Sequence, residues 1–111
     1  MALASGRLRH KVELQELLQF QDSNGDVTTE WQTIARPWAA IEPLSARDLI
    51  AAQAVQSEVR GKITIRRREN INASMRFLHR GMAYQIFGIM PDPVSGLEYQ
   101  VALTGEGVKL V

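Results

Sequence analysis

The alternation of apolar and cationic residues between Val59 and Arg68 constrains the fold of this chain more than any other feature. This segment reads V-R-G-K-I-T-I-R-R-R, and its odd positions from Val59 to Ile65 are apolar or glycine. The even positions hold Arg60, Lys62, Thr64, Arg66 and Arg68. A period of two places successive side chains on opposite faces of a pleated strand. The pattern therefore predicts a half-buried strand whose second face presents cations to water or to an anionic partner.

Length and composition predict a single globular domain over residues 1–111. The chain is 45% hydrophobic and 23% charged, and its length allows one modest core. No run approaches the roughly 18 apolar residues of a membrane span, and the N-terminus lacks the apolar core of a signal peptide. Because the chain has no cysteine, disulfides and thiolate metal sites are excluded. We expect neither export nor a membrane partner.

Charge is sorted along the chain, although the net charge is only +1. Six of the 13 Lys and Arg residues lie between Arg60 and Arg68 or at Arg76, whereas the stretch from Glu13 to Glu30 is acidic. Local sorting of this kind suits an ordered interface between neighbouring copies at least as well as it suits nucleic acid.

The N-terminal half is predicted to form a hairpin followed by a third extended run. Alternation predicts a first strand over residues 7–18, and Asn24-Gly25 favours a type I′ turn, in which both residues have positive φ. A second strand then carries Trp31 and Ile34. Pro37 interrupts the ladder because it lacks a backbone donor, and the extended run resumes over residues 38–41.

A short helix is predicted to follow this run. Ser45 and Asp48 resemble a capping box, and residues 49–56 have high helix propensity. The apolar stripe of this helix is thin, and it consists of Ala46, Leu49, Ile50 and Ala54. Because a helix this short gains little without packing or a partner, we expect it to be mobile or docked on another surface.

The C-terminal half is predicted to contain short strands over residues 74–79, 82–89 and 99–103. A tight turn at Arg80-Gly81 and a loop from Pro91 to Gly96 connect them. Five or six short strands with one helix inserted between them predict a mainly β fold, a small antiparallel barrel or sandwich.

No catalytic, cofactor-binding or metal-binding residues are predicted, and we expect that the protein is not an enzyme. The only histidines are His10 and His79, and no metal-ligand spacing, nucleophile elbow or phosphate loop occurs. Trp31 and Trp38 are expected in the core or at a subunit contact, because tryptophan is enriched in both places.

The basic strand has two interpretations that the residues leave open. Arg60, Lys62, Arg66 and Arg68 could follow a phosphate backbone, as in an OB-like barrel that binds single-stranded nucleic acid. However, no aromatic residue accompanies them on the strand. Alternatively, the cations form a solvated face or salt bridges between subunits.

The order of sequence motifs resembles that of the bacteriophage head–tail joining proteins, also called head completion, stopper or head–tail adaptor proteins. The matching pieces are G-R-L-R-H-K-V at 6–12, N-G-D with T-E-W within 24–31, W-A-A-I-E-P-L-S-A-R-D at 38–48, K-I-T-I-R at 62–66, M-R-F-L-H-R-G-M-A-Y-Q-I-F-G-I at 75–89 and G-E-G at 105–107. The resemblance spans nearly the whole chain, and W-A-A-I-E-P-L-S-A-R-D is its most specific piece.

The resemblance implies a small β-barrel with a helix or long loop inserted at about residues 44–57. It implies a ring that matches the portal symmetry, binds portal and tail proteins, and in some phages closes the channel that holds packaged double-stranded DNA. The protein would lie in the virion of a phage or prophage, at the head–tail junction, and in the host cytoplasm during assembly. A tail terminator or minor tail protein is a further alternative.

Candidate assembly residues follow from loops, aromatics and the inserted segment. They are Asn24, Gly25, Trp31, Trp38, Leu49, Ile50, Pro91 and Asp92. The four cations Arg60, Lys62, Arg66 and Arg68 would face either DNA or a neighbouring subunit.

Overall fold

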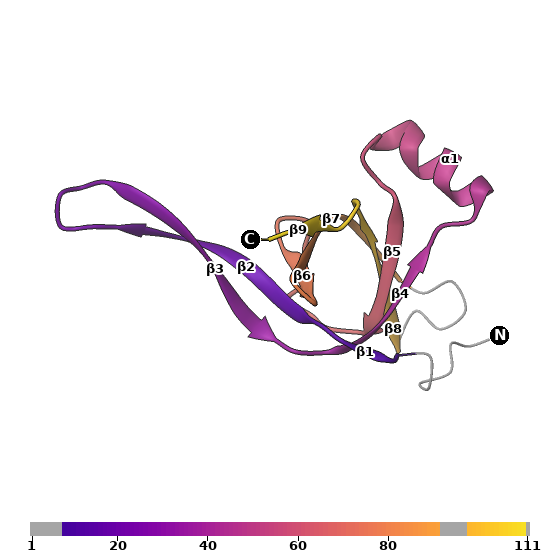
Figure 1. Cartoon of the computed structure of the whole chain (residues 1–111), viewed down its shortest axis with the longest axis horizontal. Coiled ribbons are helices and arrows are strands. Elements are labelled where there is room, and N and C mark those ends of the chain that lie inside the picture. The colour runs from indigo at the N-terminus through magenta and orange to yellow at the C-terminus, as the bar shows by residue number, and fades with distance from the viewer. Residues whose placement is uncertain (1–7, 92–97, 111) are drawn as a thin grey trace.

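The protein is an antiparallel β-structure with one helix inserted between two strands (Figure 1). The computed structural model describes residues 8–91 and 98–110. Within these residues the elements are β1 (His10–Lys11), β2 (Glu13–Gln21), β3 (Val27–Ala35), β4 (Trp38–Pro43), α1 (Ala46–Val55), β5 (Gly61–Arg66), β6 (Arg76–His79), β7 (Met82–Pro91), β8 (Tyr99–Thr104) and β9 (Val108–Lys109).

These strands form one curled sheet with the shape of a half-barrel (Figure 1). The strand order is β1-β4-β5-β8-β7-β6-β2-β3, and β9 pairs with β7 beside this path. Only Val12 separates β1 from β2, and its amide donates to the carbonyl of Pro37, between β3 and β4, at 3.0 Å. The segment that contains β1 and β2 therefore pairs with the segment that contains β3 and β4 twice, once at each end of the strand order. This double pairing curls the sheet around its core.

The predicted fold class is confirmed, but the predicted number of strands is wrong. The described residues form nine strands rather than five or six. A break at Val12 divides the predicted first strand into β1 and β2, and β9 is a two-residue strand that alternation did not reveal. The predicted interruption at Pro37 separates β3 from β4. The helix lies between β4 and β5, as the resemblance implied.

The core lies on the inner face of the curled sheet. Ile63 and Ile65 of β5 are completely buried there, which confirms the predicted apolar face of this strand. The other face of β5 differs from the prediction. Thr64 is buried and Lys62 is half-buried, because β5 lies between β4 and β8 and Lys62 lines a groove beneath α1. Only the end of the strand at Arg66 presents a cation freely to water.

A long hairpin projects from the curled sheet (Figure 1). Strand β2 pairs with β3 over almost its whole length, whereas β6 pairs with β2 only at residues 13–15. Residues 16–32, here called the arm, therefore continue as a two-stranded ribbon beyond the last strand that supports it. The longest dimension of the molecule is 54 Å, and the arm lies along it.

The arm ends in the predicted turn, although the turn type differs. Gly25 has a φ of +85°, but Asn24 does not have a positive φ, so the turn is not type I′. Instead, a carboxylate oxygen of Asp22 accepts hydrogen bonds from the amides of Asn24 and Asp26, both at 2.9 Å. A side chain therefore shapes this loop. At the second predicted turn, both Arg80 and Gly81 have positive φ, as a type I′ turn requires.

The predicted helix is confirmed and its N-terminus is capped as expected. The hydroxyl of Ser45 accepts a hydrogen bond from the amide of Asp48 at 3.2 Å. No residue of α1 is buried, and the side chains of Ile50 and Val55 are 72% and 92% exposed. The helix lies in the connection between the paired strands β4 and β5, and Pro43 before it and Gly61 after it are directly paired. Neither this helix nor any other helical segment of the described residues is long and apolar enough to span a membrane.

Replacing Ser45 with alanine is expected to destabilise α1 by about 1 kcal/mol, because one amide of the first turn loses its acceptor. Hydrogen exchange of amides 48–52 should accelerate about fivefold, since 1.4 kcal/mol corresponds to a factor of ten. The urea midpoint of the whole protein should stay nearly constant, because α1 contributes no buried residue to the core. Ser57→Ala, beyond the helix end, is the matched control. An equal loss of global stability would show that α1 folds as one unit with the sheet.

Candidate assembly surfaces

The base of the arm is held by a polar network centred on Arg76. The Nε of Arg76 donates to the Gln15 side chain at 2.8 Å, and its guanidinium lies 4.2 Å from the centre of the Trp31 ring. The amide nitrogen of Gln15 in turn donates to the Thr33 hydroxyl at 3.1 Å. Desolvation lowers the pKa of Arg76 below its ordinary value. Trp31 is therefore half-buried at the arm's base, where its ring is already covered by a cation of the same chain.

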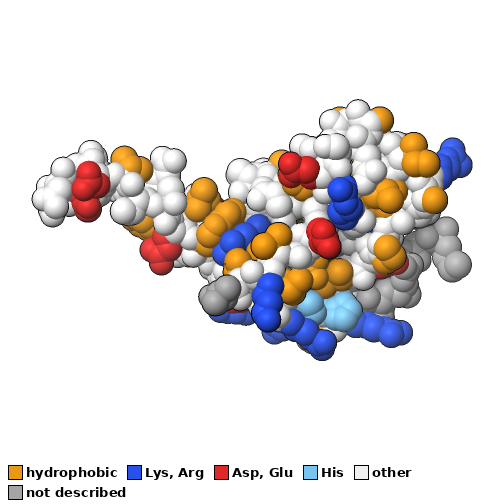
Figure 2. Space-filling model, turned by 45° about the horizontal axis from the view of Figure 1, so that its top comes forward, with side chains coloured by type: hydrophobic (Ala, Val, Ile, Leu, Met, Phe, Trp, Pro, Cys, Tyr) orange, Lys and Arg blue, Asp and Glu red, His pale blue; other side chains and the backbone are white. Residues whose placement is uncertain are grey.

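Beyond this base the arm is acidic and carries exposed apolar side chains. Residues 13–35 contain five Asp or Glu residues and no Lys, Arg or His. Leu17, Phe20 and Val27 are 44%, 48% and 64% exposed. Figure 2 shows the outer part of the arm with apolar and acidic side chains and no cation. A two-stranded ribbon is only marginally stable in water, so this composition is typical of a segment that packs against another surface.

One face of the arm combines the carboxylates of Glu16 and Glu30 with the ring of Phe20. Glu16, Leu18 and Phe20 alternate along β2, so their side chains lie on the same face, and Glu30 is paired with Leu18. We call Glu16, Leu18, Phe20 and Glu30 the acidic face of the arm. The opposite face carries Leu17 and Trp31, which are paired with each other, and leads to the Arg76 network.

A second surface, here called the cationic row, crosses the outer side of the sheet through Lys11, Trp38, Arg66 and Tyr99. Lys11 pairs with Trp38, and Arg66 pairs with Tyr99. Trp38 and Arg66 are also neighbours, because Trp38 precedes Ala39, Arg66 follows Ile65, and Ala39 pairs with Ile65 in antiparallel register. The Nζ of Lys11 lies 5.6 Å from the Trp38 ring centre, and the Arg66 guanidinium lies 5.7 Å from that of Tyr99.

Trp38 is therefore a surface residue rather than a core residue. Its side chain is 54% exposed between two cations, whereas Tyr99 is buried beneath Arg66. Sequence reasoning found no aromatic residue beside the basic strand, because Trp38 and Tyr99 come from β4 and β8. Only the register of those strands reveals them as neighbours of Arg66.

The four cations predicted from β5 do not form one continuous strip. The guanidinium of Arg60 donates to the carbonyls of Ser57 and Val59 at 2.6 and 3.1 Å, near the start of the strand. Lys62 lines a groove beneath α1, and buried Thr64 separates it from Arg66. Arg66 and Arg68 lie at the other end of β5, where the Gln100 side chain accepts from the amide of Arg68 at 2.9 Å.

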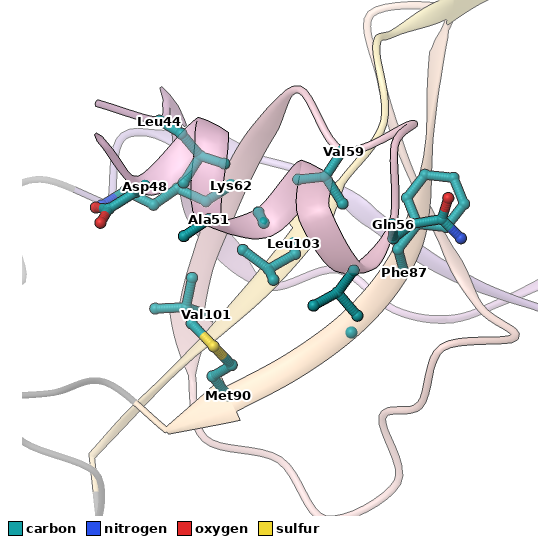
Figure 3. Close-up of a pocket in the computed structure, with 13 residues that line it drawn as sticks. Leu44, Asp48, Ala51, Gln56, Val59, Lys62, Phe87, Met90, Val101 and Leu103 are labelled. Carbon is teal, nitrogen blue, oxygen red and sulfur yellow. The ribbon is translucent and has the colours of Figure 1, made fainter. Parts of the chain in front are cut away.

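A third surface is the apolar groove between α1 and the outer side of the sheet (Figure 3). Its volume is about 550 Å³, and the sheet side is formed by Val101, Leu103 and Met90. The helix side is formed by Ala51, Ala52 and Val55. At the C-terminal end of the helix, the Gln53 side chain donates to the carbonyl of Val59 at 2.9 Å.

The helix face that lines this groove differs from the predicted apolar stripe. The stripe was expected at Ala46, Leu49, Ile50 and Ala54, but none of these residues lines the groove. Leu49 is half-buried and Ile50 is exposed. The helix side of the groove is formed instead by Asp48, Ala51, Ala52, Val55 and Gln56, a set that is not uniformly apolar and that an apolar stripe therefore does not identify.

The remaining candidate residues lie in or next to loops. Asn24 and Gly25 are exposed at the tip of the arm, and Pro91 is exposed at the end of β7. Asp92 and most of the predicted loop from Pro91 to Gly96 lie outside the described residues.

The described residues contain no group of three or more His, Asp or Glu side chains that could hold a metal ion. His10 and His79 lie edge to face, with ring centres 5.0 Å apart. The molecule thus presents three exposed surfaces: the arm, the cationic row and the groove beneath α1.

Comparisons with known proteins agree over nearly the whole chain. A family model described as phage head completion protein matches residues 3–104. The fold is similar to the solution structure of protein SF1141 from Shigella flexneri 2a, with a TM-score of 0.78, 27% identity, and coverage of 94% of this chain and 96% of that chain. It is also similar to a chain in the virion of a native gene transfer agent particle, with a TM-score of 0.59, 15% identity, and coverage of 92% and 96%. No relative was found among curated proteins.

Proposed function

Because the chain belongs to the phage head completion protein family, we propose that it joins the capsid portal to the tail as one subunit of a ring. The family assigns it a structural role in the virion, where it assembles with other virion proteins. The observation that carries the proposal is the family match over residues 3–104. The similar chain in a gene transfer agent virion supports a place in such a particle.

The three surfaces suit such a subunit. Protein assembly requires exposed apolar and charged patches rather than a pocket with converging titratable groups. The arm extends well beyond the curled sheet and can reach another subunit, and Trp38 is an exposed aromatic residue of the kind that anchors interfaces. In a ring, these surfaces would meet neighbouring copies, the portal above and the tail below.

The segment over residues 44–57 is the part that we expect to rearrange on assembly. Moving α1 away from the sheet exposes little buried surface, because none of its residues is buried. The groove beneath it would then be open to an apolar segment of the portal. Ordering or displacing such a segment costs conformational entropy, which contacts made only in the assembled particle can offset. In this way the segment would narrow or close the DNA channel only after docking.

The test is a phage or prophage that lacks only this coding sequence. We expect DNA packaging to start normally, and heads and tails to accumulate separately, with loss of packaged DNA from the heads. Purified protein added to such an extract should restore infectious particles, and labelled protein should lie at the head vertex in electron micrographs. Tails of abnormal length on joined heads would indicate a tail terminator instead. Normal particles, or a salt-dependent affinity for free oligonucleotides without binding to portal rings, would also contradict the proposal.

A further inference from the structure

The charges of this molecule are divided between the arm and the rest of the chain. Residues 13–35 carry a net charge of −5, and the whole chain carries +1, so the other residues carry +6. Glu13 at the base is already paired with Arg36 at 3.5 Å. The carboxylates of Glu16 and Glu30 lie further out on the acidic face. Since no cation occurs on the arm, any side chain that pairs with these carboxylates must come from another surface.

The cationic row is the surface with the opposite composition. Its cations Lys11 and Arg66 are exposed, and so are Arg9 and Arg68, each two residues along the chain from one of them, as well as the carboxylates of Glu69 and Glu98. Trp38 lies exposed in its middle. Because each sheet strand is about 4.8 Å from the next, Lys11 and Arg66, on either side of Trp38, lie about 10 Å apart.

We propose that the acidic face of the arm docks on the cationic row of a second copy of this chain. In that contact Phe20 lies against Trp38, and the carboxylates of Glu16 and Glu30 face the cations of the row. Glu16 and Phe20 are four residues apart on one strand, about 13 Å, and the Leu18–Glu30 pair lies midway between them, so both carboxylates lie on the side of Phe20 that is nearer the base of the arm. An aromatic pair surrounded by complementary charges is the usual composition of an interface centre and its rim.

The geometry makes this contact intermolecular. The arm extends away from the curled sheet and cannot reach its own β1, β4 and β5 (Figure 1). The two surfaces are different, so each copy uses its arm on one neighbour and its row on the other. Such a head-to-tail contact generates a closed ring when the rotation closes. The inference rests on the proposed function only in that it supplies the contact between ring subunits.

Packaged DNA is a competing partner for the cationic row, but the observations favour the arm. A duplex would neutralise the cations through their charge alone. It would leave Phe20 half-exposed and the carboxylates of the arm without a partner. Docking of the arm covers both surfaces at once.

The first experiment exchanges the charges. The arm variant carries Glu16→Lys and Glu30→Lys, and the row variant carries Lys11→Glu and Arg66→Glu. We expect sedimentation velocity at low salt to show that the unmodified chain associates with rising concentration. Each variant alone should associate at least about tenfold more weakly, because like charges then meet. An equal mixture of the two variants should associate again, because each arm then finds a row of opposite charge. The double variant Glu106→Lys and Lys109→Glu, outside both surfaces, is the control.

The second experiment traps the contact covalently and does not depend on a stable complex. The chain has no natural cysteine, so one can be placed at Thr28, directly opposite Phe20, and another at Arg68 in a separate preparation. Oxidation of the mixture of Thr28→Cys and Arg68→Cys proteins should give far more mixed dimer than Thr28→Cys with Lys109→Cys. Circular dichroism verifies that each variant is folded.

Equal cross-linking of both cysteine pairs, or association that the charge exchanges leave unchanged, would overturn the proposal. If a row variant cross-linked normally but had lost its affinity for duplex DNA, the cationic row would be a DNA-binding surface instead. These results are separable from the proposed function. Copies that bind portal rings but do not pair through the arm contradict only this inference, whereas copies that pair but do not bind portal rings contradict only the proposed function.

Discussion

Replacing Phe77 with alanine is expected to lower the free energy of unfolding by about 3–5 kcal/mol. Phe77 is completely buried, and β6 places it between Leu14 of β2 and Tyr84 of β7. Its removal leaves a cavity in the middle of the curled sheet, where paired strands prevent collapse. Since domains of this size are stable by about 5–15 kcal/mol, the variant should be partly unfolded at 37 °C. Urea denaturation followed by circular dichroism measures the effect.

Phe20→Ala is the matched control, because it removes the same ring from the exposed part of the arm. Its effect on the free energy of unfolding should be about 0.5 kcal/mol or less. If both variants lost similar stability, the arm would be part of the core in solution and would not be available to a partner.

Replacing Arg76 with methionine is expected to cost about 2 kcal/mol and to loosen the arm before the rest of the sheet. The change removes the ring contact with Trp31 and leaves the Gln15 oxygen without its charged donor. Methionine retains most of the apolar stem, so lost packing contributes little. Hydrogen exchange should accelerate most at amides 16–32, where β2 and β3 have no third strand to support them.

Arg68→Met, at an exposed cation that contacts Gln100 only through its backbone, is the control and should leave the exchange pattern unchanged. Uniform acceleration over the whole sheet in the Arg76→Met protein would contradict a separate role for the network at the arm's base.

The sequence predicted those features that depend on local pattern. Alternation located the buried face of β5 at Ile63 and Ile65, and the Ser45 cap located the start of α1. Both signals arise from neighbouring residues, because strand period and helix capping are local properties. The same alternation could not show that Lys62 lines a groove beneath α1. That position depends on how elements distant in sequence are placed.

The candidate surfaces depended on register, which the sequence did not reveal. Trp38 and Arg66 are neighbours because Ala39 pairs with Ile65, and no local pattern contains this pairing. The arm was recognised as a hairpin, but its projection follows from β6 pairing with β2 at residues 13–15 only. A strand has the same sequence pattern whether or not a third strand pairs with it. The length of the ribbon that lacks a third strand could therefore not be inferred from the sequence.

The pairing of Pro43 with Gly61 means that the sheet tolerates changes to the exposed helix between these two residues, although Val59 before Gly61 is buried. The two ends of this connection are held together by the ladder, and the entropy of closing a loop rises only slowly with its length. A chain of this fold can therefore lengthen, shorten or replace residues 45–57 while keeping the same scaffold. The position is accordingly suitable for grafting a peptide tag.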